Sequence, residues 1–191
     1  PFKLSQLGPG VAWCDLDGDG HDDLIVGSGR GGAPAFFRGD GRGGFSKMEP
    51  PAGMVLPDDS TGIVGWTPAP GQRALLIGVA SYEATNHAAV IQIDAANGAL
   101  KTGASLPETR SSTGPLAVAD MDGDGDLDLF VGGRVVTGRY PEAASSRIFR
   151  HDGKQLQLDA ENSRALENVG LVSGAVWSDL DGDGRPELLL A

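Results

Sequence analysis

The chain has 191 residues, of which 15 are Lys or Arg and 26 are Asp or Glu, so its formal net charge is −11. This acidic balance argues against binding to a nucleic-acid backbone, which needs clustered basic side chains. The sequence has no run of 18 apolar residues, which excludes a membrane-spanning helix. Its 30 glycines and 12 prolines predict many short elements joined by turns around a folded core.

The first predicted element is a hairpin around an acidic segment. Apolar residues 11–13 and 24–26 flank residues 15–23, which we call loop 1. Short apolar runs bounded by glycine are typical of strands buried on both faces. Two further strands are expected at 35–38 and 44–47, so the first unit has four strands.

The second unit repeats this pattern without the acids. Trp66 stands in the frame of Trp13, yet residues 67–73 contain no Asp or Glu, and the strand at 74–78 follows them. Strands at 87–93 and 99–101 complete the unit. The repeat is therefore predicted to be a structural unit that forms with or without a metal-binding loop.

The third and fourth units carry two more acidic segments, loop 2 (120–128) and loop 3 (179–187). Each lies between short apolar runs. The predicted strands are 116–118, 129–131, 146–150 and 155–158 in the third unit, and 175–177 and 188–190 in the fourth.

The three loops share one spacing of acidic residues and hold 14 of the 26 in the chain. Each has Asp at positions 1, 3 and 5, Gly at position 6 and an acid at position 9. The predicted metal ligands are Asp15, Asp17, Asp19 and Asp23 in loop 1, Asp120, Asp122, Asp124 and Asp128 in loop 2, and Asp179, Asp181, Asp183 and Glu187 in loop 3. Position 7 would bind through its backbone carbonyl, and it is His21, Asp126 and Arg185 in turn.

This spacing predicts three Ca²⁺ sites. Crowded carboxylates repel one another unless a cation neutralises them, and Ca²⁺ takes six to eight oxygen ligands from flexible loops. An EF-hand is rejected, because position 12 is Val26, Val131 or Leu190 and the flanks are not helical. The alternative is that the Asp-Gly pairs only form hairpin turns with solvated acids.

Four-stranded units of about 50 residues are typical of β-propeller blades. We expect an all-β chain of antiparallel strands that forms one propeller segment of about three and a half blades. The approximate units are 10–61, 62–113, 114–173 and 174–191.

With these repeated acidic loops, nearly the whole chain resembles FG-GAP/VCBS repeat proteins, whose calcium-loop blades are similar to those of the integrin α-subunit propeller. The third and fourth units are especially similar to bacterial UnbV-type and cartilage-acidic-protein-like members, at residues 129–134, 138–141 and 176–184. The resemblance implies Ca²⁺ ligation at loop positions 1, 3, 5, 7 and 9, and a ring of about seven blades. The resemblance implies no metal site at residues 67–73, because they lack the acidic residues of the pattern.

The expected function is a calcium-stabilised scaffold or protein-interaction module, extracellular or periplasmic, without catalysis. Its partner would be another protein or a second propeller half. His21, His87 and His151 fall in different units outside any catalytic motif, and each is interpreted as a solvated loop or strand-end residue. The alternative is a glycan-binding or polysaccharide-processing propeller, because propeller loops can surround a ligand channel.

The remaining predictions concern single residues. Trp13, Trp66 and Trp177 are expected in the core, and Cys14 as a small packed residue rather than a reactive thiol. Tyr82, Tyr140 and the polar segment 134–145 are the predicted surface for partner contact.

Overall fold

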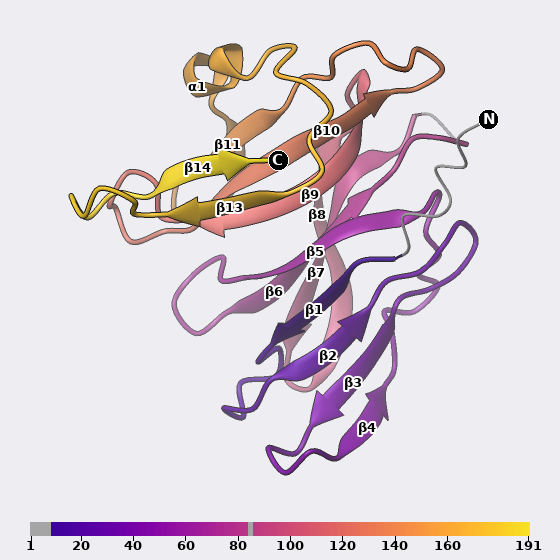
Figure 1. The fold of residues 1–191 in the computed structure, drawn as a ribbon. Coiled ribbons are helices and arrows are strands. Elements are labelled where there is room, and N and C mark those ends of the chain that lie inside the picture. Colours follow the sequence, from indigo (N-terminus) through magenta and orange to yellow (C-terminus); the bar gives the residue numbers. More distant parts are fainter. Residues whose placement is uncertain (1–8, 84–85) are drawn as a thin grey trace.

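The computed structural model describes residues 9–83 and 86–191, which form four antiparallel sheets and one short helix (Figure 1). We call the sheets blades 1 to 4. Blade 1 contains β1 (Val11–Cys14), β2 (Asp23–Val26), β3 (Ala35–Gly39) and β4 (Phe45–Met48). Blade 2 contains β5 (Ser60–Trp66), β6 (Arg73–Val79), β7 (Ala88–Ala96) and β8 (Ala99–Pro107). Blade 3 contains β9 (Ser111–Ala119), β10 (Asp128–Val136), β11 (Arg147–His151) and β12 (Leu156–Leu158), and blade 4 the pair β13 (Ala175–Ser178) and β14 (Glu187–Leu190).

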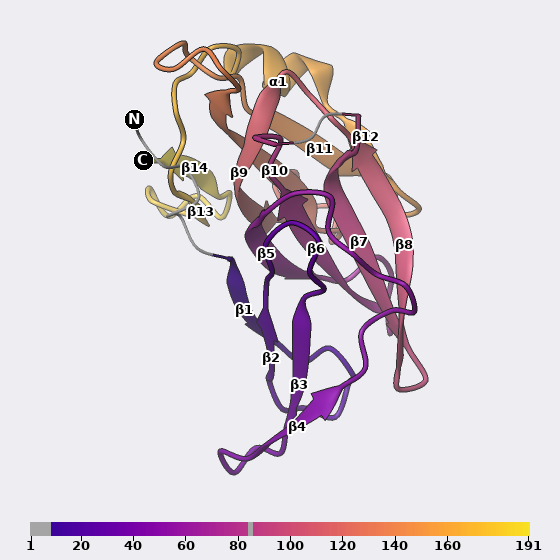
Figure 2. The same cartoon turned by 90° about the vertical axis from the view of Figure 1, so that its right-hand side faces the viewer.

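In each blade the strands pair in chain order, as an up-and-down meander. The first strands of successive blades lie beside one another: β1 contacts β5, β5 contacts β9 and β9 contacts β13. The sheets therefore follow one another as side-by-side layers (Figure 2). This is the blade arrangement of a β-propeller, and the predicted fold class is confirmed. The blades that the structure describes do not close a ring.

Hydrophobic clusters fill the spaces between neighbouring blades. One cluster joins blades 1 and 2, a second joins blades 2 and 3, and a third joins blades 3 and 4. Blade 2 is buried on both faces, because blade 1 packs on one side of it and blade 3 on the other. Successive residues of a strand point to opposite faces, so one strand can contribute to both clusters. Leu75 of β6 belongs to the first cluster and Leu76 to the second, as predicted for a strand buried on both faces.

The outer face of blade 1 is apolar and exposed. Val11 and Trp13 of β1 are 55% and 56% exposed, and the ring of Phe45 lies 5.6 Å from that of Trp13. The prediction that Trp13 is a core residue is therefore wrong, because no described sheet covers this face. Trp66 is buried as predicted, and Trp177 is half-buried against the third cluster.

One element was not predicted, the helix α1 (Ala160–Ala165). Asp159 caps it by accepting a hydrogen bond from the backbone N–H of Asn162. Nowhere in the described chain is there a helix with the length and apolar character of a membrane span.

Candidate metal centres

The three acidic loops each join the first two strands of a blade. Loop 1 connects β1 to β2, loop 2 connects β9 to β10, and loop 3 connects β13 to β14. Because β1, β9 and β13 run in similar directions, the loops lie at the same end of the array, on the left in Figure 1. The predicted placement of each loop between a pair of strands is confirmed.

All three loops turn through two glycines with left-handed backbone. These are Gly18 and Gly20, Gly123 and Gly125, and Gly182 and Gly184, with φ between 79° and 94°. Positions 4 and 6 of the motif are thus both glycine because an L side chain is strained in this conformation.

These turns direct backbone N–H groups at the first carboxylate. Asp15 accepts hydrogen bonds from Gly18 at 2.7 Å and Gly20 at 3.1 Å. Asp120 and Asp179 accept the equivalent pairs at 2.7 and 2.9 Å. The sequence therefore fixes the orientation of the position-1 carboxylate in every loop.

In each loop three carboxylates offer oxygen atoms that lie within 4.8 Å of one another. The groups are Asp15, Asp17 and Asp19; Asp120, Asp122 and Asp128; and Asp179, Asp181 and Glu187. Asp23, Asp124 and Asp183 are not members of these groups. Hard divalent cations such as Ca²⁺ prefer donor sets made only of oxygen, so the residues fit the predicted ion.

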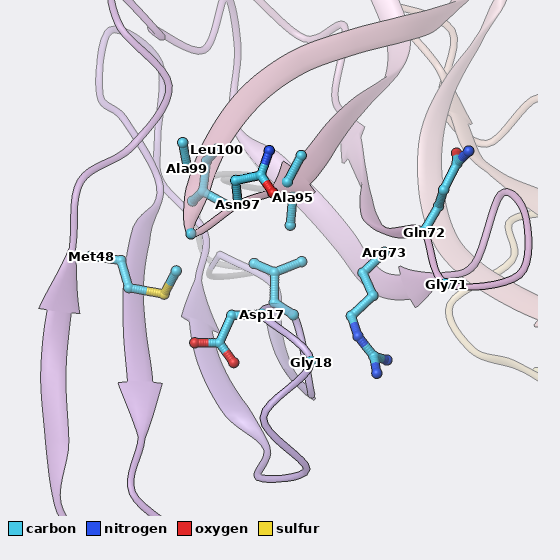
Figure 3. Close-up of a pocket in the computed structure, with 13 residues that line it drawn as sticks. Asp17, Gly18, Met48, Gly71, Gln72, Arg73, Ala95, Asn97, Ala99 and Leu100 are labelled. Carbon is cyan, nitrogen blue, oxygen red and sulfur yellow. The ribbon is translucent and has the colours of Figure 1, made fainter.

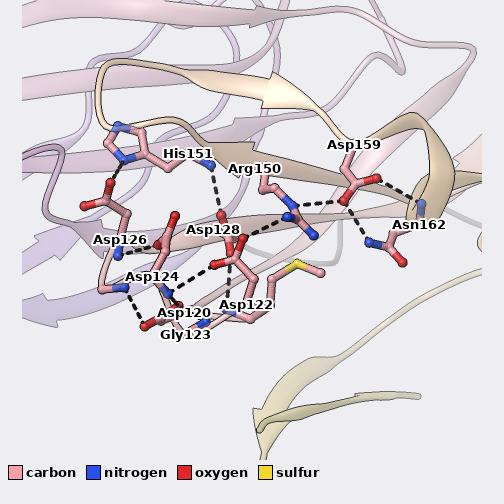
Figure 4. A network of polar contacts seen from close by, with 12 residues as sticks. Asp120, Asp122, Gly123, Asp124, Asp126, Asp128, Arg150, His151, Asp159 and Asn162 are labelled. Atoms are coloured by element: carbon pink, nitrogen blue, oxygen red, sulfur yellow. Dashed lines mark hydrogen bonds and ion pairs between the residues drawn. The ribbon is translucent and has the colours of Figure 1, made fainter.

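The position-9 carboxylates of loops 1 and 2 are buried and tie each loop to the third strand of its blade. Asp23 accepts hydrogen bonds from the N–H groups of Leu16 and Gly39. Asp128 accepts them from Met121 and His151 (Figure 4). Burial raises the pKa of the Asp128 carboxyl above its usual value, although these two N–H donors oppose the shift.

The position-7 side chains differ, as expected where only the backbone is required. His21 and Arg185 are exposed. The carboxylate Oδ2 of Asp126 lies 3.3 Å from Nδ1 of His151, whose side chain is fully buried. His151 is the strand-end residue that was predicted, since it ends β11, but it is not solvated: it is buried with its ring edge-on to Trp66.

In the described part of the chain, three arginines from outside the loops form ion pairs with loop carboxylates, and none of them is among the predicted site residues. Arg38 of β3 pairs with Asp17, and Arg150 at the same place in β11 pairs with Asp122 at 2.8 Å. Arg73, the first residue of β6, lies 3.4 Å from Asp15. The equivalent positions of Arg38 and Arg150 were a signal that strand alignment could have found, whereas the position of Arg73 depends on how blades 1 and 2 pack.

Blade 2 has no acids in its first hairpin, but this hairpin reaches loop 2 as well as loop 1. Trp66 donates a hydrogen bond from its indole N–H to the backbone oxygen of Leu127 at 3.0 Å. The acid-free hairpin is therefore part of the surroundings of both neighbouring loops.

The predicted partner surface is only partly exposed. Tyr140 is 63% exposed, but Tyr82 is half-buried and burial raises the pKa of its hydroxyl. Residues 134–136 belong to β10 and not to a loop, since this strand runs to Val136.

Comparison with known families identifies a repeat in the N-terminal part of the chain. The model of the FG-GAP repeat matches residues 7–45, a segment that includes β1, loop 1, β2 and β3. This match identifies one FG-GAP repeat in the chain, in blade 1. No significant match to a curated protein was found. The finer resemblance to UnbV-type members stays a prediction.

Proposed function

We propose that this protein is a calcium-stabilised β-propeller module that acts in protein–protein interaction and has no catalytic activity of its own. The observation that carries the proposal is the repeated convergence of three carboxylates in a glycine-shaped hairpin loop. Ca²⁺ would be held by the carboxylates of positions 1, 3, 5 and 9 and by the backbone carbonyl of position 7.

Bound Ca²⁺ would contribute stability because it binds the folded loop and not the unfolded one. Each folded loop holds several negative charges close together, and the cation offsets their repulsion. Loops of this kind are filled at the calcium concentrations of extracellular fluids. We therefore place the protein in an extracellular or periplasmic compartment.

Support for a protein partner comes from the apolar faces at both ends of the array. Trp13 and Phe45 lie on the outer face of blade 1, and Val176 and Leu189 are 55% and 37% exposed on blade 4. Clustered apolar side chains on a surface are typical of interaction sites. Another protein or a second propeller half would bury them.

Calcium-dependent stability tests the proposal. Thermal unfolding is measured with excess EGTA and with Ca²⁺ at about a hundredfold the dissociation constant, where each site adds about 2.7 kcal/mol to the free energy of unfolding. The Asp122→Ala variant should lose the contribution of loop 2 and keep the rest.

Asp152→Ala is the matched control. Asp152 also accepts hydrogen bonds from nearby backbone N–H groups, those of Lys154 and Gln155, but belongs to none of the three carboxylate groups. Its loss should lower stability equally with and without calcium. A melting temperature that does not respond to millimolar Ca²⁺ would refute the calcium part of the proposal.

A further inference from the structure

Loop 1 differs from loop 2 by a positive charge that comes from the neighbouring blade. Arg38 and Arg150 occupy equivalent positions, so both loops have an arginine on the position-3 carboxylate. Among the described residues, a second arginine lies within 4 Å of a loop carboxylate in loop 1 alone: Arg73 of blade 2, which pairs with the position-1 residue Asp15. No ion pair is formed by the carboxylates of loop 3 with the described residues.

Arg73 also packs on the backbone of loop 1. A Cβ atom added at Gly18 would lie 2.9 Å from Nε of Arg73, whereas the equivalent atoms at Gly123 and Gly182 would meet nothing within 4 Å. In Figure 3 the Arg73 side chain extends from the start of β6 toward Gly18. The contact is thus specific to loop 1 and lies between two blades.

We propose that Arg73 is a built-in counter-ion of loop 1, supplied by the metal-free blade, which competes with Ca²⁺ for Asp15 and lowers the calcium affinity of this loop alone. The inference rests on the proposed calcium function and concerns its regulation. It makes loop 1 the site at which calcium uptake is coupled to the packing of blade 2 on blade 1.

The competition follows from charge and geometry. Asp15 is the carboxylate that the two loop glycines orient, and its Oδ2 is the atom that lies 3.4 Å from the Arg73 guanidinium. A divalent cation bound to this carboxylate would experience repulsion from the guanidinium at short range. Ca²⁺ must therefore displace Arg73 or bind against its charge, and both lower the affinity.

The structure gives Arg73 room to move. Its side chain is 42% exposed, and it borders two open hollows of about 410 and 290 Å³. The larger hollow lies between loop 1 and the β7–β8 turn at Asn97 (Figure 3). The smaller one lies beside Trp13. Displacement by calcium therefore needs a change of rotamer and no unfolding of the blade.

A site-resolved calcium titration of the isotope-labelled chain tests the inference. The backbone amide signals of Gly20, Gly125 and Gly184 report loops 1, 2 and 3 in one sample by NMR. Arg73→Gln should lower the calcium concentration of half-saturation at Gly20 roughly three- to tenfold and leave the other two glycines unchanged. Arg73→Lys keeps the charge and should stay close to the parent protein. In the parent, the Arg73 Nε–H signal should shift together with that of Gly20.

Arg30→Gln is the matched control. Arg30, which follows β2, forms an ion pair with Glu83 at 3.2 Å, and its side chain is 51% exposed against 42% for Arg73. In the described ion pairs it contacts no loop carboxylate. The Arg30→Gln variant should leave the calcium concentration of half-saturation unchanged at all three glycines. If loops 2 and 3 titrate but Arg73→Gln does not move the midpoint at Gly20, or moves all three equally, the inference is wrong and the calcium function stands. If none of the three glycine signals responds to millimolar Ca²⁺, the calcium function itself is wrong.

Discussion

Blades 1 and 2 share a strand order and pack against each other, but their first hairpins are built differently. In blade 1 two strands of 4 residues, β1 and β2, are joined by an acidic loop. In blade 2 two strands of 7 residues, β5 and β6, are joined by a turn without acids. The hairpin without carboxylates has the longer ladder of backbone hydrogen bonds and the more completely buried second strand.

This difference shows that the blade does not need a metal loop in order to form. Blade 2 is stabilised by burial of both faces, whereas loop 1 concentrates like charges that only counter-ions or a cation can offset. The acid-free hairpin also contacts its neighbours, through Arg73 to loop 1 and through Trp66 to loop 2. A hairpin without acidic residues thus contacts both adjacent candidate metal sites.

The largest expected effect tests whether packing alone holds blade 2. Leu75→Ala removes a fully buried side chain from the cluster between blades 1 and 2, and should lower the free energy of unfolding by about 2–5 kcal/mol. The loss should be equal in EGTA and in calcium, because Leu75 lies in the apolar cluster between the blades and is not a predicted calcium ligand. Denaturant unfolding under both conditions measures it. Val55→Ala, at a position 60% exposed, is the control and should change stability by less than about 0.5 kcal/mol. A marked rescue of Leu75→Ala by calcium would break the comparison.

The parts of the molecule that depend on local sequence were predictable. Asp-Gly spacing located the three loops, and short apolar runs located the strands on both sides of them, because turn geometry and strand burial are encoded within a few residues. The break between the predicted strands 87–93 and 99–101 falls at the β7–β8 turn, where Asn97 and Gly98 both have positive φ. The unit without an acidic loop was recognised as well, and it forms blade 2.

What depends on contacts between blades was not predictable. Trp13 and Trp66 stand in a similar sequence frame, yet they face opposite sides of their blades. Trp66 is buried between blades 2 and 3, whereas Trp13 lies on the face of blade 1 that points away from blade 2, where no described sheet covers it. The burial of His151 and the contact of Arg73 with loop 1 likewise arise from neighbouring elements. The helix α1 was missed because its 6 residues are too few to show a helical period.

A smaller effect is expected where blade 2 contacts loop 2. Trp66→Phe removes the indole N–H that donates to the Leu127 oxygen, and should cost about 1 kcal/mol of unfolding free energy beyond the loss of apolar contact. Because Leu127 is position 8 of loop 2, the calcium midpoint at Gly125 should rise while that at Gly20 stays constant. The glycine amide signals and denaturant unfolding measure both quantities.

Trp177→Phe provides the matched control for this substitution. The Trp177 indole N–H is buried and has no hydrogen-bond partner among the described residues. Removing it takes away a desolvated donor, so the variant should lose less stability than Trp66→Phe. Equal losses for the two variants would show that the bond between blade 2 and loop 2 contributes nothing measurable.

The smallest expected effect is that of the loop 1 carboxylates on the pKa of the Cys14 thiol. The first hairpin of blade 2 has no acidic residues, so it has no equivalent effect. Burial, reinforced by Asp23, Asp22 and Asp15, raises the pKa of the Cys14 thiol from 9.0 to about 11. Below the lower value the thiol is neutral in both states. As the pH rises from 9.0 to about 11 the unfolded chain ionises first, so this group's contribution to the free energy of unfolding falls across that window.

Iodoacetamide at about pH 8 should alkylate the Cys14 thiol of the folded chain far more slowly than that of the urea-unfolded chain. Calcium should lower the pKa of the folded thiol, because the ion offsets the carboxylates beside it while the burial remains. A pH titration of the thiolate absorbance with EGTA and with calcium measures both effects, and ionisation near 9.0 in both conditions would show that neither burial nor the loop carboxylates act on Cys14.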